Sequence, residues 1–167
     1  MDFYETVESR RSVRAYRADP VEEDKLERIL EAARLAPSAA NRQPVHFYVV
    51  TDAALRERLR EAYSQDWFVQ APVIICACHR ESEAWCRSDG KSYADVDLTI
   101  AMEHLILAAT AEGLGTCWIG AFKPAPLRKI LGIPPELEPV AMTPLGYPDE
   151  EPSSRPRKAL DEIVEFL

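Results

Sequence analysis

Residues 97–122 read DLTIAMEHLILAATAEGLGTCWIGAF, and this segment constrains the fold more than any other. Apolar residues from Leu98 to Ala109 cover most of the circumference of the helix that the pattern predicts over Asp97–Glu112. A helix that is apolar nearly all round must be covered on all sides. In a chain of 167 residues, this favours a second copy of the chain as part of the cover. Gly113 is suited to end the helix, and a strand is predicted over Thr116–Ile119.

Helices and strands are mixed on both sides of this segment, which predicts one α+β domain over residues 1–167. Asp2 and Asp52 are typical helix N-caps, and Pro37 and Gly132 are typical stops. An aromatic loop is predicted around Trp67 and Phe68. The predicted helices are Asp2–Ser9, Val21–Ala36, Asp52–Tyr63 and Ala125–Leu131; the predicted strands are Val45–Thr51, Pro72–Cys78 and Pro139–Tyr147. Residues 79–96 read as a loop with at most one helical turn, and Ala159–Leu167 fit either a helix or a strand.

Composition excludes several classes of protein. The chain has 28 acidic and 20 basic residues and a net charge of −8, which argues against nucleic acid or an anionic membrane as the main partner. Residues 1–8 do not resemble a signal peptide, and the most apolar stretch is shorter than a membrane span. Without a secretory signal, a cytoplasmic location and free thiols are expected for the four cysteines.

Two basic clusters lie near opposite ends of this acidic chain. Residues 10–17 read RRSVRAYR and contain four arginines and no acid; the second cluster is Arg155, Arg157 and Lys158. Arginine suits bidentate contacts to phosphate, and the Ser12 hydroxyl adds a neutral donor. The clusters therefore indicate either one site for an anionic group or two solvated patches that are salt-bridged to acidic neighbours.

Two further segments could bind a flat ligand. In APSAANRQPVHF, residues 36–47, the amides of Asn41 and Gln43 could read the edge of a heterocycle, although the same residues suit a plain turn. Gly113 and Gly115 lack the spacing and the preceding strand of a dinucleotide-binding fingerprint, so a Rossmann site is rejected. Gly120, after the predicted strand, would let a ligand approach the backbone.

Other chemistries find little support in the sequence. Cys76, Cys78, His79 and Cys86 lack the spacing of a zinc knuckle, so no metal site is expected. No serine lies in a nucleophile elbow, and the three histidines define no dyad. The absence of a nucleophile in the chain fits chemistry carried by a bound cofactor.

Taken in order, these segments resemble the nitroreductase family of flavin oxidoreductases, in its short members. The matching pieces span residues 9–167: SRRSVRAY, APSAANRQPVHF, the apolar helix leading into GLGTCWIGAF, PLGYP and RPRKALDEIV. The resemblance implies an α+β fold with a central, mostly antiparallel sheet between helices. It also implies an intertwined, obligate homodimer with one FMN at each end of its interface.

The resemblance also implies roles for particular residues. The FMN phosphate and the ring edge would be held by Arg10, Arg11, Ser12 and Arg14, and the phosphate site would be completed by Arg155 and Arg157. The polar edge of the isoalloxazine would contact Asn41 and Gln43, and its face would be lined by Trp118, Ile119 and Gly120. The flavin bound mainly to the other subunit would be reached by Pro37, Ser38 and Ala39. In many relatives the residue before the glycine is acidic, whereas here it is Ile119.

The activity that the resemblance implies is a ping-pong oxidoreductase reaction. NADH or NADPH would give hydride to FMN and leave, and a nitroaromatic, a quinone or a similar flat acceptor would then be reduced. Hydride transfer to flavin needs no catalytic acid or base, so none is assigned. Two alternatives remain open: a dedicated reaction on the same flavin, such as dehalogenation or flavin breakdown, and a flavin-binding protein without turnover.

Overall fold

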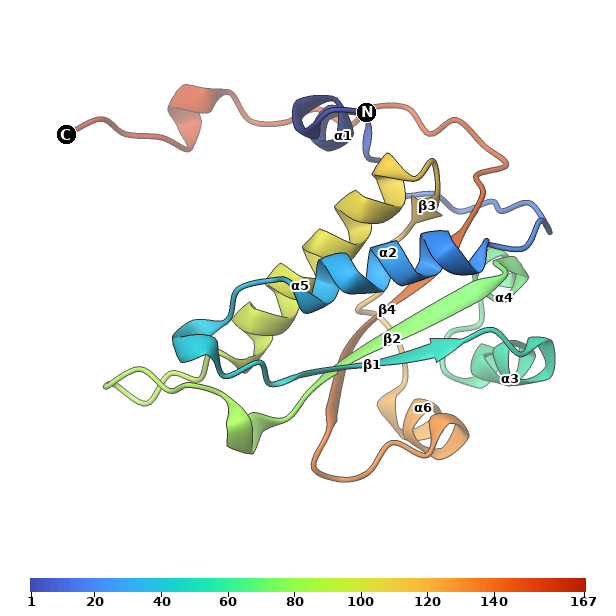
Figure 1. Ribbon diagram of the computed structural model, residues 1–167, viewed down its shortest axis with the longest axis horizontal. Helices are drawn as coiled ribbons and strands as arrows, with labels where there is room; N and C mark the ends of the chain where they lie inside the picture. The colour runs from blue at the N-terminus through green and yellow to red at the C-terminus, as the bar shows by residue number, and fades with distance from the viewer.

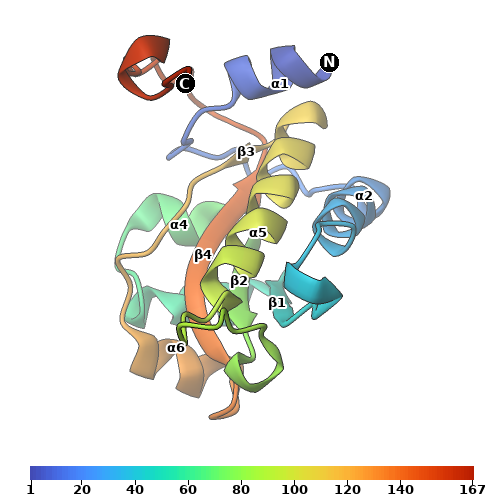
Figure 2. The same cartoon turned by 90° about the vertical axis from the view of Figure 1, so that its left-hand side faces the viewer.

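The computed structural model describes all residues from 1 to 167 and consists of a four-stranded antiparallel sheet between two helical layers (Figure 1). The strand order is β1-β2-β4-β3. Helices α2 and α5 cover one face of the sheet, and α3, α4 and α6 lie on the other (Figure 2). The strands are β1 (Val45–Val50), β2 (Val73–His79), β3 (Gly115–Thr116) and β4 (Glu138–Gly146). The helices are α1 (Phe3–Ser9), α2 (Glu23–Arg34), α3 (Ala53–Arg58), α4 (Asp66–Gln70), α5 (Ala94–Ala111) and α6 (Pro124–Leu131).

Strand β2 runs through the centre of the molecule, and all seven of its residues are buried. Its side chains alternate between two apolar cores, as the period of two in a strand requires. Ile74, Cys76 and Cys78 pack in the core beside α6, whereas Val73 and Ile75 pack in the core beside α2 and α5. The continuous apolar run of β2 in the sequence therefore follows from burial on both faces.

Helix α5 is covered mainly by its own chain. Helix α2, which lies across it, supplies Ile29 and Ala33 to the shared core. The buried residues of α5 are Ala94, Asp97, Leu98, Ala101, Met102, Leu105, Ile106 and Ala109. The single chain thus covers more of this helix than its sequence suggests, and its exposed side keeps Val96 with the partly buried Ile100 and Leu107.

Helix ends follow the predicted capping residues. The Asp2 carboxylate accepts the N–H of Glu5 at 2.9 Å, and the Asp52 carboxylate accepts the N–H of Leu55 at 2.7 Å. After α5, Gly113 has φ 78°, and the N–H of Leu114 bonds back to the carbonyl of Ala109 at 2.8 Å. This left-handed glycine ends the helix as predicted. None of the helices is both long and apolar enough to cross a membrane.

Four predictions about local structure were wrong. Helix α5 begins at Ala94, so Asp97 lies inside the helix and is buried. Of the strand predicted over Thr116–Ile119, only Thr116 lies in β3 (Gly115–Thr116), and Ile119 forms an isolated bridge with Met142. The segment around Trp67 forms the short helix α4. Residues 159–167 form neither a regular helix nor a strand, but one 3₁₀ turn at Leu160–Glu162.

Candidate functional site

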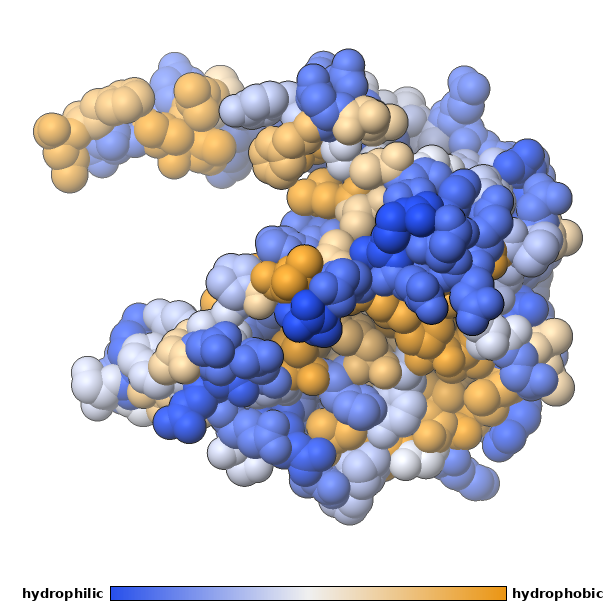
Figure 3. Space-filling view, in the orientation of Figure 1, coloured by the Kyte–Doolittle hydropathy of each residue, from blue (hydrophilic) through white to orange (hydrophobic).

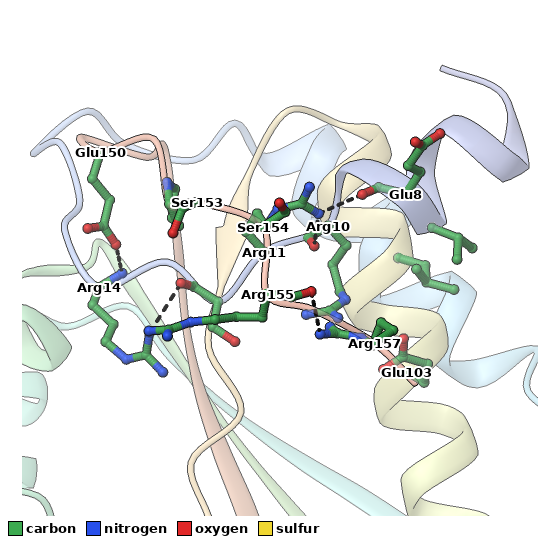
Figure 4. A pocket seen from close by; sticks show the side chains of 14 residues that line it. Glu8, Arg10, Arg11, Arg14, Glu103, Glu150, Ser153, Ser154, Arg155 and Arg157 are labelled. Atoms are coloured by element: carbon green, nitrogen blue, oxygen red, sulfur yellow. Dashed lines mark hydrogen bonds between the residues drawn. The ribbon is translucent and has the colours of Figure 1, made fainter. Parts of the chain in front are cut away.

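Most residues of the two basic clusters line one cavity of about 750 Å³ beside the C-terminal half of α5 and the start of the C-terminal tail (Figure 4). Arginines from the two ends of the chain face the same space. The lining residues are Val7, Glu8, Arg10, Arg11, Ser12, Arg14, Glu103, Leu107, Glu150, Pro152, Ser153, Ser154, Arg155 and Arg157. All six residues predicted to hold an FMN phosphate are therefore among the lining residues.

Backbone hydrogen bonds hold the two ends of the chain together beside this cavity. On one side, the N–H of Val13 donates to the carbonyl of Thr116 in β3 at 2.8 Å. On the other side, the N–H of Asp149 donates to the carbonyl of Ala15 at 2.9 Å, and Tyr16 forms an antiparallel bridge with Pro148. Residues 12–17 are thus fixed between β3 and the segment that follows β4.

Gly115 in β3 allows this arrangement. A Cβ atom built on Gly115 would lie 2.8 Å from Cγ2 of Val13, which is closer than real Cβ atoms approach. Val13 is buried with Tyr16, whose hydroxyl donates to the carbonyl of Val13 at 2.7 Å. Burial raises the pKa of Tyr16, so this hydroxyl remains a neutral donor.

The cavity arginines differ from most other arginines of the chain in having no ion-pair partner. Their side-chain hydrogen bonds go to backbone carbonyls, as when Arg11 donates to Arg10 at 2.8 Å and Arg157 donates to Arg155 at 3.1 Å. Arginines that do form ion pairs with carboxylates are Arg17, Arg28, Arg34, Arg60, Arg80, Arg87 and Arg128. Of the arginines in the two clusters, only Arg17 pairs with an acidic neighbour, Asp19, and the five that line the cavity form no such salt bridge.

Three glutamates also line the cavity, and none of them forms an ion pair with these guanidinium groups. A carboxylate oxygen of Glu150 accepts the backbone N–H of Arg14, which ties the start of the tail to the N-terminal cluster. Glu8 and Glu103 complete the acidic lining. Five arginines against three glutamates leave the cavity with a net charge of +2. The cavity suits a doubly charged anion.

Cys117, which follows β3, is the thiol closest to this region in sequence. Burial raises its pKa, while the charge of Arg14 acts in the opposite direction. Its backbone N–H is accepted by the Thr143 hydroxyl at 3.1 Å. A buried thiol with a raised pKa is protonated at neutral pH and is a poor nucleophile.

The loop that carries Asn41 and Gln43 lies at the other end of α5. Its Ala39 N–H contacts Asp97 in the first turns of α5, whereas the cavity contacts Glu103 and Leu107 further along the helix. Ten residues of helix from Asp97 to Leu107 span about 15 Å. Pro37, Ser38, Ala39, Asn41 and Gln43 are therefore not brought to the arginine cavity of their own chain.

The predicted ring-face residues also lie outside the cavity lining. Ile119 is buried against Met142 of β4, and the Trp118 side chain is 39% exposed. A Cβ atom on Gly120 would have no neighbour closer than Trp118 Nε1 at 4.0 Å, so this backbone is open to a ligand. One chain thus assembles the arginine cavity but separates it from the remaining predicted contacts.

Sequence reasoning missed three residues that shape these sites. Glu150 and Gly115 are ordinary in a loop and a strand, and only the fold places them against Arg14 and Val13. The sequence pattern predicts Asp97 as the start of its helix, whereas it lies buried inside α5. A role for Asp97 could have been predicted from the sequence, because a carboxylate in a mostly apolar helix needs a hydrogen-bond partner.

Comparison with known proteins decides the family. The model of the nitroreductase family matches residues 7–67 and 60–147, which is more than half of the chain. The chain belongs to the nitroreductase family. An NADH dehydrogenase/NAD(P)H nitroreductase of Methanothermobacter thermautotrophicus is 34% identical over 93% of this chain and 82% of that protein.

Two further nitroreductase relatives extend the comparison. The FMN reductase [NAD(P)H] of Bacillus subtilis is 29% identical over 88% of this chain and 66% of that protein. The crystal structure of a nitroreductase family protein from Clostridium difficile has a TM-score of 0.90 and 34% identity, over 99% of this chain and 98% of that one. The expected α+β nitroreductase fold is thereby confirmed.

Proposed function

We propose that this protein binds FMN with the phosphate in the arginine cavity and uses NAD(P)H to reduce a flat acceptor such as a nitroaromatic or a quinone. Its relatives share the class of NAD(P)H-dependent flavin oxidoreductases. The observation that carries the proposal is the set of five unpaired arginines in one cavity of a chain with a net charge of −8.

The charge of the cavity supports a phosphate monoester as its ligand. Such a group carries a charge of about −1.5 to −2 near pH 7 and offers three strong acceptor oxygens. Arg10, Arg11 and Arg14 from one segment, with Arg155 and Arg157 from the other, leave a net charge of +2 after three glutamates. Because these guanidinium groups have no carboxylate partners, they keep their donors for an incoming anion.

The position of each residue determines its proposed role. Bound FMN would supply the hydride-accepting and electron-donating chemistry. The arginines would fix the phosphate, the amides of Asn41 and Gln43 would contact the polar edge of the ring, and the open backbone at Gly120 would allow its face to approach. No side chain is assigned an acid or base role.

A homodimer would bring the separated contacts together. In one chain the loop at residues 37–43 lies at the opposite end of α5 from the arginine cavity. A second copy could present its own loop to the flavin of the first, as expected from the family resemblance for Pro37, Ser38 and Ala39. The partly exposed Ile100 and Leu107 beside the cavity would then lie in the interface.

The test compares FMN with riboflavin, which has the same ring but no phosphate. A charge-assisted hydrogen bond contributes about 1.5–3 kcal/mol, so Arg10→Ala and Arg157→Ala should each weaken FMN binding about tenfold to a hundredfold. Riboflavin affinity should change far less. Flavin fluorescence titration of the purified apoprotein measures both affinities.

The matched control is Arg87→Ala, since Arg87 pairs with Asp89 at 2.6 Å in the loop after β2 and lies outside the cavity. It should leave both affinities nearly unchanged. Equal, small effects of all three substitutions on FMN would contradict the proposal. NAD(P)H oxidation with and without nitroaromatic or quinone acceptors then distinguishes an enzyme from a flavin-binding protein without turnover.

A further inference from the structure

A buried carboxylate in α5 holds the loop that carries Asn41 and Gln43. Asp97 is only 2% exposed, and its Oδ1 accepts the backbone N–H of Ala39 at 2.9 Å. Its Oδ2 is also buried and has no hydrogen-bond partner. Burying a carboxylate with one oxygen unpaired is unfavourable, and a small apolar residue would fit the apolar helix without this penalty. The hydrogen bond to the Ala39 N–H is therefore what the Asp97 side chain adds to the fold.

The loop needs such an anchor because its backbone is strained. Ala40, Asn41 and Gln43 have φ angles of 51°, 56° and 52°. Alanine and glutamine disfavour this left-handed region, so neighbouring contacts must maintain the conformation. Two contacts do so at its ends: Asp97 accepts from Ala39, and the Ser38 hydroxyl accepts the N–H of Gln43 at 2.9 Å.

The side chains between these anchors are free to bind a ligand. Asn41 and Gln43 are exposed, and the side-chain amide of Gln43 donates only to the carbonyl of Asn41 at 3.2 Å. Their direction is set by the backbone that Asp97 holds. Without the anchor, the left-handed residues could relax and the two amides would lose their fixed geometry.

We infer that Asp97 is a positioning residue for the flavin ring: by holding the Ala39 N–H, it fixes the amides of Asn41 and Gln43 for contact with the ring's polar edge. This inference rests on the proposed function, since it assigns these amides to the flavin. A defect in this loop can be distinguished by measurement from a defect in the arginine cavity. A defect at the ring edge weakens binding of FMN and riboflavin equally, whereas a defect at the phosphate weakens only FMN.

The experiment compares Asp97→Ala and Asp97→Asn with Asp95→Asn. Asn at position 97 keeps an oxygen acceptor for Ala39. Asp95 is 75% exposed on the same helical turn and lies 3.2 Å from Nε2 of His79; asparagine keeps an oxygen for that contact, so Asp95→Asn controls for the lost charge. Hydrogen exchange of the apoprotein, read by mass spectrometry, tests the anchor without any flavin. Fluorescence titrations with FMN and riboflavin test its consequence for binding.

In Asp97→Ala, residues 36–44 should exchange faster while β2 stays protected, and the affinities for FMN and riboflavin should both fall about tenfold. Asp97→Asn should keep most of the loop's protection and of both flavin affinities, and Asp95→Asn should match the wild type.

If Asp97→Ala does not fold, the smaller, parallel losses of FMN and riboflavin affinity in Asp97→Asn decide the question. Unchanged riboflavin affinity in a variant whose loop exchanges faster would overturn the inference alone. Wild-type protein that binds neither flavin would overturn the proposed function and the inference together.

Discussion

Ala40 adopts backbone angles that a glycine would adopt at little cost. Its φ of 51° and ψ of 25° lie in the left-handed region, which costs a non-glycine residue about 1–2 kcal/mol. Ala40→Gly should therefore stabilise the protein by about 0.5–1 kcal/mol, after the extra flexibility of glycine in the unfolded chain is subtracted. The expected rise in melting temperature is about 1–4 °C, measured by thermal unfolding. A fall would show that the loop is not strained at this residue.

Gly115 controls how closely the N-terminal arginine segment packs on β3. In Gly115→Ala, the new Cβ would meet Val13 at 2.8 Å, and overpacking of this kind costs about 1–3 kcal/mol. Since Val13 lies between Ser12 and Arg14, FMN binding should weaken along with stability. Urea unfolding and flavin titration measure the two effects. Gly120→Ala is the control for stability, because its Cβ would have no neighbour within 4.0 Å except Trp118 Nε1.

An ion pair that depends on pH joins the middle of α2 to the C-terminal end of α5. Arg28 donates to both carboxylate oxygens of Glu112 at 2.7 and 3.0 Å, and this lowers the pKa of Glu112 below its ordinary value of 4.5. A carboxyl pKa that is lower in the folded state stabilises the fold above the unfolded pKa, and the contribution is lost as pH falls through the folded value. Arg28 is 52% exposed, so the effect is small.

Glu112→Gln should accordingly lower the urea midpoint slightly at pH 7. The difference from wild type should shrink as the pH falls below 4.5 and vanish once Glu112 is protonated in the folded state. Unfolding curves at several pH values provide the measurement. The charge-neutralising control is Glu103→Gln, since Glu103 is exposed and forms no ion pair. A difference that does not shrink below pH 4.5 would mean that the carboxylate charge is not its cause.

Periodicity predicted the long helices and strands because burial of apolar side chains against the core dominates their stability. In α2, the spacing of Leu26, Ile29, Leu30 and Ala33 reflects a single buried face, and the helix lies within the predicted range. In β2, burial on both faces gave an unbroken apolar run. Local patterns were sufficient wherever a helix or strand is stabilised mainly by the core it covers.

Elements fixed by contacts between distant residues could not be predicted in the same way. The strand at residues 116–119 is interrupted because the Thr143 hydroxyl, rather than a backbone carbonyl, accepts the N–H of Cys117. The pattern placed Asp97 at the start of its helix, but its carboxylate accepts the N–H of Ala39 from a distant loop. For the candidate site, the arginine motifs indicated the lining of the cavity, while Glu150 and the left-handed loop required coordinates.

At the scale of the whole molecule, the C-terminal tail forms an apolar arm that extends away from the body (Figure 3). Leu160 is 69% exposed, Ile163 is 66% exposed and Phe166 is 92% exposed. Apolar side chains gathered on an extended arm favour association with another surface. Under the proposed function, that surface belongs to a second copy of the chain.

The chain should therefore sediment as a dimer at micromolar concentration, with an interface of about 2,000 Å² or more. Removal of residues 159–167 should weaken the dimer and flavin binding together, while Arg155 and Arg157 remain in place. Analytical ultracentrifugation of both proteins gives the association constants. A full-length monomer that binds FMN tightly would contradict both the dimer and the shared flavin site.

The cavity joins the two ends of the chain, and this has a consequence for biosynthesis. Arg10 leaves the ribosome well before Arg157, because the whole sheet is synthesised between them. At a synthesis rate of about 5–20 residues per second, about 7–30 s pass between the synthesis of Arg10 and that of Arg157, which lines the same cavity. A nascent chain can bury β1 and β2 early, but its arginine cavity is still incomplete. Under the proposed function, tight FMN binding must therefore follow the synthesis of Arg157, and a chain that terminates before it should not retain the flavin.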